Sequence, residues 1–259
     1  MTNLKQVLTA ALLAAAASAA QAQATRMMMP EGTYDLVLGM AFEKTYFSGR
    51  NEGSRSVLVP ALEVQWSNGI FAEVGTREAF VGMHLSDDPV LDYGVQLAMS
   101  GRDQRTDTPG ERGGVSVQAG GFFGWRVLHN MSLSGQLTAG GGFDGGGVLA
   151  HARARYYVYL AARQGATLAA GLFAADHSWQ QGYFGVTAAQ SASGGNPAYR
   201  APAGLVSVYG DVEWHWQWAN KYSSYTGVRY TRLASGPADS PLVGGRSRIS
   251  LRTSVNYHF

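Results

Sequence analysis

The chain has 259 residues, 15% of them charged and 34 of them glycine, with a net charge of +2. So small a charge gives no argument for a nucleic-acid or an acidic partner. Cysteine does not occur, which excludes disulfides, amino-terminal lipidation and cysteine-based catalytic or metal sites. Beyond the first 24 residues no apolar run reaches the roughly 18 residues of a membrane helix.

The amino-terminal segment has the pattern of a secretory signal peptide. Lys5 precedes an apolar, alanine-rich run at 7–20, and Ala22-Gln23-Ala24 supplies small residues for cleavage. We expect cleavage after Ala24, with cleavage after Ala22 as the second possibility. Residues 1–24 are then removed and 25–259 form one barrel domain. The pattern predicts export from the cytoplasm.

The rest of the sequence alternates between apolar and polar residues with a period of two. This is the pattern of β-strands that have one apolar face. In chain order the alternating segments are 34–42, 58–66, 70–76, 91–99, 115–127, 131–139, 152–160, 166–174, 206–218, 222–233 and 248–259. Turn sequences such as Ser67-Asn68-Gly69 separate neighbouring segments. The sequence therefore predicts an all-β chain.

Connection lengths decide the number of strands. Bacterial barrels have an even number, with short periplasmic turns and longer outer loops. Short turns at 128–130, 162–165 and 219–221 alternate with loops at 102–113, 141–147, 177–203 and 235–246. Short and long connections continue to alternate as far as the amino terminus only if the less regular segment 80–85 is also a strand. We predict a transmembrane, up-and-down antiparallel β-barrel of about 12 strands, with about 10 as the alternative.

The last segment, Arg248 to Phe259, carries the strongest signal for a membrane barrel. It is about as long as the 9–11 residues that a tilted strand needs to cross a bilayer. It also ends on an aromatic residue, which resembles the terminal strand of bacterial outer-membrane barrels. Four tryptophans lie at the strand ends that we expect to face the periplasm: Trp66, Trp214, Trp216 and Trp218. Their position predicts an aromatic girdle at the membrane interface. A soluble sandwich with a long edge strand is the alternative.

Catalytic and ligand-binding motifs are scarce. The sequence contains no GxSxG and no HExxH. The glycines at 140–147 are better explained by an outer hairpin loop than by a phosphate cradle, because no helix pattern follows them. Asp87 and Asp88 precede Pro89 in a turn, where Asx chemistry explains them without a cation. We predict no catalytic, cofactor-binding or metal-binding residues.

One polar cluster has three possible interpretations. Asp211, Glu213 and His215 alternate along one segment, and a second trio, His151, Arg153 and Arg155, alternates along another. Inside a barrel these side chains can form a salt-bridged plug, line a path selective for small solutes, or form a catalytic site. His215 beside Glu213 and a serine would be the raw material of a hydrolase triad. We favour the structural plug.

Segments in the last third of the chain resemble the MltA-interacting protein (MipA)/OmpV family. The matching residues there are Tyr183-Phe184-Gly185-Val186, Ser191, Ser193, Tyr199, Leu233, Ser240-Pro241-Leu242-Val243 and Phe259. Ser100-Gly101-Arg102 is an earlier echo of the same family. The resemblance covers 176–259, and the amino-terminal half matches more loosely. It implies a barrel in the outer membrane of a Gram-negative bacterium. For the founding members it implies a scaffold that brings a murein lytic transglycosylase together with a murein synthase.

We therefore expect a monomeric, non-enzymatic scaffold or adaptor without cofactors. Its expected partners are outer-membrane lipid, murein synthases and a lytic transglycosylase, and no nucleic acid. The first alternative is a narrow, porin-like channel with a water path past Arg153, Arg155 and Glu213. The second is a barrel enzyme that depends on His215 or His151. A loop 177–203 that folds inward would favour the scaffold.

Overall fold

The computed structural model describes residues 32–48, 53–75, 78–101, 115–142 and 145–259. The predicted signal peptide at 1–24 and the predicted loop at 102–113 lie outside these ranges. The strands are β1 (Tyr34–Ser48), β2 (Gly53–Trp66), β3 (Ile70–Val74), β4 (Glu78–His84), β5 (Leu91–Gly101), β6 (Val115–Leu128), β7 (Met131–Gly142), β8 (Gly145–Ala161), β9 (Gln164–Ala175), β10 (Gly204–Ala219), β11 (Tyr222–Leu233) and β12 (Ser247–His258).

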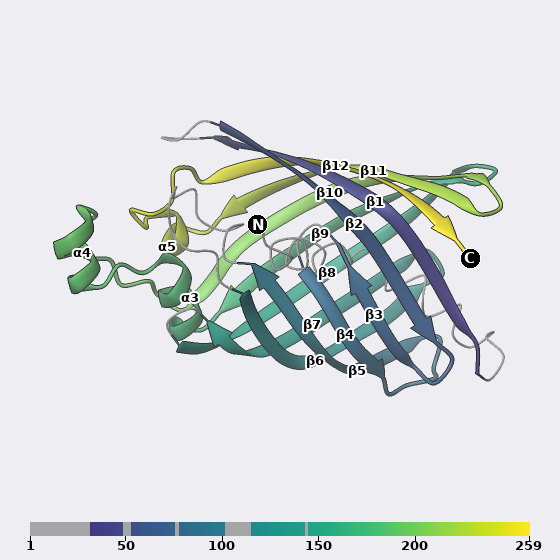
Figure 1. Cartoon of the computed structure of the whole chain (residues 1–259), viewed down its shortest axis with the longest axis horizontal. Coiled ribbons are helices and arrows are strands. Elements are labelled where there is room, and N and C mark those ends of the chain that lie inside the picture. The colour runs from purple at the N-terminus through teal and green to yellow at the C-terminus, as the bar shows by residue number, and fades with distance from the viewer. Residues whose placement is uncertain (1–31, 49–52, 76–77, 102–114, 143–144) are drawn as a thin grey trace, which may run out of the picture.

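These strands form one closed, antiparallel barrel (Figure 1). Each strand pairs with its neighbours in sequence, and β12 closes the ring against β1 from Val37↔His258 to Ser48↔Ser247. The prediction of twelve strands is confirmed, including the irregular β4, which pairs with both β3 and β5. Because β12 pairs with β1, neither the first nor the last strand has an open edge. A barrel in lipid requires this closure.

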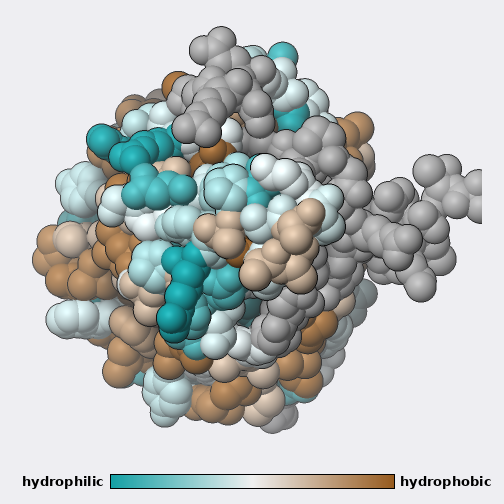
Figure 2. Space-filling model, turned by 90° about the vertical axis from the view of Figure 1, so that its left-hand side faces the viewer, coloured by the Kyte–Doolittle hydropathy of each residue, from teal (hydrophilic) through white to brown (hydrophobic). Residues whose placement is uncertain are grey.

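The outer surface of the barrel is apolar. On β10, Val212 is 52% exposed whereas its neighbour Glu213 is 5% exposed, and on β12 Leu251 and Ser250 differ in the same way. Figure 2, which looks onto the end that carries the helices, shows hydrophobic residues around the perimeter and hydrophilic residues nearer the middle. A soluble sandwich would bury this face, whereas lipid stabilises it. The chain is an outer-membrane β-barrel.

Aromatic residues form a continuous row at the end of the barrel that has the short turns. Ring centroids follow one another from Trp214 to Trp216 (5.6 Å), Trp218 (6.4 Å) and Tyr222 (5.7 Å). The row continues across β12 through Tyr257 to Phe259. Amphipathic aromatic rings are favoured where hydrocarbon meets headgroups. Three of the four predicted girdle residues, Trp214, Trp216 and Trp218, thus lie together at the short-turn end, whereas Trp66 is not part of this row.

Several predicted connections are shorter in the structure, because the flanking strands extend further; the turns at 128–130 and 219–221 each lose their first residue to a strand. The loop predicted at 141–147 is mostly strand, since Gly140 pairs with Gly147 and Gly142 with Gly145. Glycine keeps its backbone donor and acceptor, so a run of glycines can extend a hairpin. It is also required here, because a Cβ on Gly147 would lie 2.4 Å from the backbone nitrogen of Trp179. The turn predicted at 162–165 is confined to 162–163.

The segment 177–203 is not irregular throughout, as the sequence predicted, but contains α3 (His177–Phe184) and α4 (Ala188–Gly194). A further short helix, α5 (Ser235–Ala238), lies in the next long loop. Asp176 caps α3 by accepting a hydrogen bond from the Trp179 amide (2.7 Å), and Thr187 and Gln190 form a capping box on α4. Among the described residues, no helix is long and apolar enough to cross a membrane.

The two long loops together form a cap at one end of the barrel. We use the name loop cap for α3, residues 185–203 and residues 234–246. Its apolar core joins α3 to the inward faces of β8 and β9, and consists of Leu149, Ala175, Trp179, Tyr183, Phe184, Ala201 and Val206. In Figure 1, α3 lies against the end of the barrel while α4 projects away from it. Several of the residues that carry the family resemblance lie in this cap, including Tyr183-Phe184-Gly185-Val186, Tyr199 and Ser240-Pro241-Leu242-Val243.

Three hydrogen-bonded contacts hold the loop cap together. Val186 and Tyr199 pair as an isolated bridge, with both backbone bonds at 2.9 Å. The hydroxyl of Ser240 donates to the carbonyl of Phe184 (2.6 Å), and that of Tyr199 donates to the carbonyl of Gly236. Burial, with a contribution from Asp239, raises the pKa of Tyr199 above its ordinary value. The hydroxyl therefore remains a donor at neutral pH, and the bond is lost only as the pH rises through that raised pKa.

The apolar exterior predicts a large cost for a charge at mid-strand. Val212→Arg places a cation on the lipid-facing side of β10 and should destabilise the barrel by about 2–4 kcal/mol. Denaturant unfolding from lipid vesicles measures this cost. Val212→Leu, which keeps the side chain apolar, should change the stability much less. Equal stability of the two variants would contradict the assignment of this face to lipid.

The loop cap predicts a local effect for Tyr199→Phe. Loss of the bond to the Gly236 carbonyl should weaken the cap by about 1 kcal/mol and leave the strands unchanged. Limited proteolysis of the folded barrel should then cleave several-fold faster within 187–198. The matched control is Tyr230→Phe, which removes a hydroxyl from the outer face of β11. If both variants are cleaved at the wild-type rate, Tyr199 does not hold the cap.

Candidate functional site

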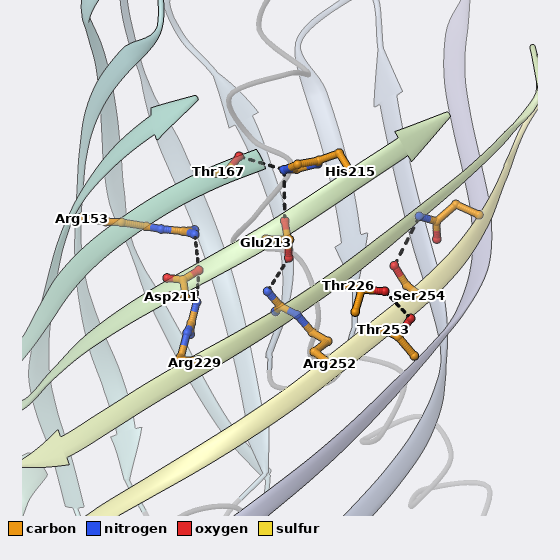
Figure 3. A network of polar contacts seen from close by, with 11 residues as sticks. Arg153, Thr167, Asp211, Glu213, His215, Thr226, Arg229, Arg252, Thr253 and Ser254 are labelled. Carbon is orange, nitrogen blue, oxygen red and sulfur yellow. Dashed lines mark hydrogen bonds and ion pairs between the residues drawn. The ribbon is translucent and has the colours of Figure 1, made fainter. Parts of the chain in front are cut away.

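Asp211, Glu213 and His215, the first predicted trio, lie along β10 on the inner wall of the barrel, and Arg153 of the second trio reaches Asp211 from β8 (Figure 3). Arg153 of β8 donates to Asp211 Oδ2 of β10 at 3.2 Å. Arg229 of β11 donates to the same oxygen at 3.5 Å. Arg153 and Asp211 are each at most 6% exposed. One carboxylate therefore joins β8, β10 and β11, and Arg153 reaches it across the intervening β9.

Glu213 is the centre of a second group, one step along β10. Arg252 of β12 donates to Glu213 Oε2 at 2.8 Å, reaching past β11. On the other side of Glu213, the Oε1 atom lies 3.7 Å from His215 Nε2. Removal of one partner from a buried ion pair typically costs about 3–5 kcal/mol, because the other charge stays buried. This wall, from β8 to β12, is therefore fixed by charge pairs.

The contacts of His215 do not form a hydrolase triad. Its Nε2 atom lies 2.8 Å from Thr167 Oγ1, and the same nitrogen faces Glu213. In a triad the acid and the nucleophile contact different ring nitrogens, so that the acid orients the ring while the other nitrogen takes the proton. His215 Nδ1 has no hydrogen-bond partner in the part of the chain that the structure describes. Thr167 and Glu213 therefore contact the same ring nitrogen, and the ring cannot pass a proton from one to the other as in a triad.

His151 and Arg155 complete the second trio. His151 stacks on Phe173 with the ring centroids 4.2 Å apart, and its Nε2 forms a 2.8 Å hydrogen bond with the hydroxyl of Tyr209. The guanidinium of Arg229 covers the other side of this group, 4.3 Å from the centre of the Tyr209 ring. Arg155 lines a cavity together with Arg153 and His151. The sequence placed these three residues on one face, and the structure brings all three to the same cavity.

The cavity lies in the lumen between the inner faces of β2 and β8. Three rings form part of its wall: Phe71, His84 and Phe122, with centroids 4.9 to 5.6 Å apart. Each phenylalanine lies over a glycine of the adjacent strand. A Cβ on Gly82 would be 2.5 Å from the Phe71 ring, and one on Gly94 would be 2.5 Å from the Phe122 ring. The glycines therefore let both rings lie flat against the wall.

A buried histidine–aspartate pair lies at the edge of this aromatic wall. His84 Nδ1 is 2.8 Å from Asp92 Oδ1, and both side chains are almost inaccessible to solvent. The Asp92 carboxylate accepts the hydrogen bond from His84 Nδ1 and so fixes the orientation of the ring. Both His84 and Asp92 line the cavity. The pair therefore presents an imidazole of fixed orientation to the cavity.

Sequence reasoning missed this pair. His84 and Asp92 flank the turn at 86–89, and the tight turn was the signal that could have brought them together. His84 lies opposite Gly94, so Asp92 is its diagonal neighbour. Asp88 does what the turn requires, since its Oδ1 accepts from the amides of Val90 (2.7 Å) and Leu91 (3.3 Å). Within the described residues, no group of acidic and histidine side chains has the arrangement of a metal site.

Comparisons with solved structures return barrels of the outer membrane at low identity. The chain is similar to the KdgM porin (9% identity, TM-score 0.45, covering 85% of this chain and 99% of that one). It is also similar to an outer-membrane channel from Pseudomonas putida F1 (9%, 0.46, 89% and 97%). A third is the translocator domain of the autotransporter NalP from Neisseria meningitidis (14%, 0.44, 97% and 99%). No curated protein matches the sequence.

The family comparison covers most of the chain. The sequence matches the family described as MltA-interacting protein MipA over residues 36–259. This range includes all twelve strands except the first two residues of β1, together with the whole loop cap. It also extends the resemblance beyond the carboxyl-terminal third in which the matching motifs are concentrated. The chain belongs to the MltA-interacting protein MipA family.

Proposed function

We propose that this barrel is a non-enzymatic scaffold of the outer membrane that holds enzymes of murein metabolism at the periplasmic surface. The family's description as MltA-interacting protein points to a murein lytic transglycosylase as one partner. A murein synthase would be the second. In this proposal the mature chain begins at Thr25 and acts as a monomer.

The observation that carries the proposal is the burial of the charged side chains on the inner wall. A water path past Arg153 and Glu213 would leave these side chains exposed, but both are only 5% exposed. Each is ion-paired, Arg153 with Asp211 and Glu213 with Arg252. Ion pairs this inaccessible to solvent support a structural role over selective conduction.

The loop cap supports the same proposal. Loop 177–203 packs α3 onto the inward-facing residues Leu149 and Ala175 instead of standing clear of the barrel. Trp179 and Tyr183, both less than 5% exposed, fill this end of the β8–β10 wall. A loop fixed in this way narrows the mouth. The barrel then acts through its surfaces, and the short-turn end is the one that would face murein.

The contacts of the two candidate histidines agree with a non-enzymatic role. His215 presents one nitrogen to both Thr167 and Glu213, and His151 is stacked and hydrogen bonded inside an aromatic group. Neither ring is placed between an acid and a nucleophile. Both contribute packing and hydrogen bonds to the wall.

A closed lumen predicts electrical silence. If the ion-paired wall and the loop cap together close the lumen, the refolded barrel in planar bilayers should show no steady single-channel conductance. Folding would be verified beforehand by circular dichroism. Steady, salt-dependent current that changes on Arg153→Ala or Glu213→Ala, but not on Thr226→Ala at the outer face, would contradict the closed scaffold. That result would establish the narrow channel instead.

The scaffold predicts that partner binding depends on the short-turn end. Lys221→Glu reverses an exposed charge in the turn between β10 and β11, and should weaken binding of the organism's own lytic transglycosylase several-fold at low salt. Surface plasmon resonance with the folded barrel measures this change. The matched control, Arg200→Glu, reverses an exposed charge in the loop cap at the other end and should bind as wild type.

Two results of this binding experiment would count against the scaffold. Absence of transglycosylase binding to a verified folded barrel would remove the proposed partner. A loss of binding in Arg200→Glu with none in Lys221→Glu would place the contact on the opposite membrane face, away from murein.

A further inference from the structure

We infer that the lumen cavity binds a small, neutral, aromatic molecule that has a hydrogen-bond donor at one edge of its ring and an acceptor at the other. This inference concerns the inside of the barrel and goes beyond the scaffold, whose docking surfaces lie outside it. It rests on two buried amides with unpaired atoms, on the aromatic surface between them, and on the state of the charged groups around them.

Gln65 contributes a buried acceptor to the cavity. Its side chain lines the cavity from β2 and is 3% exposed. The amide nitrogen donates to the backbone carbonyls of Trp66 (3.0 Å) and Ile70 (3.3 Å) at the neighbouring turn. These two bonds fix which way the amide points, and Oε1 has no hydrogen-bond partner in the part of the chain that the structure describes. A donor that reaches this oxygen relieves the cost of burying it unpaired.

Gln96 contributes a buried donor to the same cavity. Its side chain lines the cavity from β5 and is 8% exposed. The Nε2 atom has no hydrogen-bond partner among the described residues. Most buried side-chain polar atoms in proteins are hydrogen bonded, so two unpaired amide atoms on one cavity call for partners from outside the chain. The surface between the two amides indicates which partner.

The strand register places an aromatic surface between the amides. Gln65 pairs with Phe71, Phe71 with Gly82, and Gly82 with Gln96, so that the four residues form one row across β2 to β5. Gly82 has no side chain, and the Phe71 ring occupies the space that a Cβ there would need. Neighbouring strands are about 4.8 Å apart, so the two ends of the row are separated by about 14 Å. A ring with an amide on either side therefore lines the cavity.

His84 and Phe122 extend this aromatic surface. Their ring centroids lie 4.9 and 5.6 Å from that of Phe71, and Asp92 fixes the orientation of the imidazole. The cavity has a volume of about 110 Å³. An apolar cavity of about 150 Å³ holds benzene, so the space suits a single ring. Water would satisfy the amides but gain nothing from the rings, whereas an aromatic molecule with polar edges does both.

The charged groups around the cavity favour a neutral ligand. Four charged side chains also line it: Glu63, Glu73, Arg153 and Arg155. Each of them already interacts with other groups of the protein, as Arg153 does with Asp211. A charged ligand would lose its hydration and compete with these interactions, whereas a neutral one leaves them in place.

The cavity reaches the short-turn end of the barrel. Gln65 is the last residue but one of β2, His84 the last of β4, and Asp92 the second of β5. All three line the cavity, and all three lie beside short turns. The loop cap is at the opposite end. The ligand therefore has its shortest route of entry from the short-turn end.

The test measures binding of para-hydroxyacetophenone to the refolded barrel by isothermal titration calorimetry, after subtraction of the heat from protein-free micelles. At slightly acidic pH this molecule is neutral, with a hydroxyl donor at one edge and a carbonyl acceptor at the other. Para-methoxyacetophenone lacks the donor, and para-ethylphenol lacks the acceptor. The first probe should bind saturably and the other two about tenfold more weakly, since each loses a hydrogen bond to a buried amide. Equal binding of all three, or no saturable heat from the first, would overturn the inference.

A fourth probe tests the neutrality of the site. Para-hydroxybenzoate keeps the ring and the hydroxyl but adds a negative charge, and it should bind at least about tenfold more weakly than para-hydroxyacetophenone. Tighter binding of this anion would contradict a site for neutral molecules.

Variants assign the two edges of the ligand. Gln96→Met removes the amide with little change in volume, and should weaken para-hydroxyacetophenone about tenfold while leaving para-ethylphenol unchanged. Gln65→Met should weaken the same probe and leave para-methoxyacetophenone unchanged. Phe71→Leu, which should weaken all three neutral probes, is the second variant in case Gln65→Met does not fold. The control is Asn256→Leu, which removes a buried amide from β12 outside the cavity and should bind as wild type. An equal loss in this control would contradict a local site.

Discussion

The pairing of β1 with β12 is the interaction on which the rest of the structure depends. A sheet in lipid has no water to satisfy its edges, so every backbone donor and acceptor must find a partner within the protein. The two terminal strands meet over twelve residue pairs, from Val37↔His258 to Ser48↔Ser247. The length and regular alternation of β12 follow from this requirement. Its final aromatic residues extend the girdle at the short-turn end.

Closure has a consequence for the inner face. Because side chains alternate, a strand with an apolar exterior places every second residue in the lumen. On the β8–β12 wall this inner face contains arginines and carboxylates that satisfy one another, with Asp211 between two guanidiniums. Buried pairs give little net stability compared with apolar packing, but they are costly to break. They therefore fix the geometry of the wall but add little to the free energy of folding.

The period of two predicted eleven strands directly, and parity supplied the twelfth, β4, whose alternation is weak because Gly82 replaces an inward side chain. Partners across strands were not predictable, because they depend on register. Arg229 lies opposite Asp211, and a bulge between Gln217 and Ala219 shifts that hairpin. The helices α3 and α4 were missed because, at eight and seven residues, they are too short to show a clear 3.6-residue period. The pairing of His84 with Asp92 likewise depends on the diagonal geometry of a hairpin.

The two halves of the lumen differ for a reason visible in their side chains. From β8 to β12, long charged residues reach past intervening strands and fill the wall, as Arg252 does in reaching Glu213. From β3 to β6, glycines lie beneath Phe71 and Phe122, and the rings lie along the wall instead of projecting across the lumen. A barrel of fixed circumference must fill its interior or leave it hollow. Here the glycines leave room beside Phe71 and Phe122 for a cavity that extends across to Arg153 of the ion-paired wall.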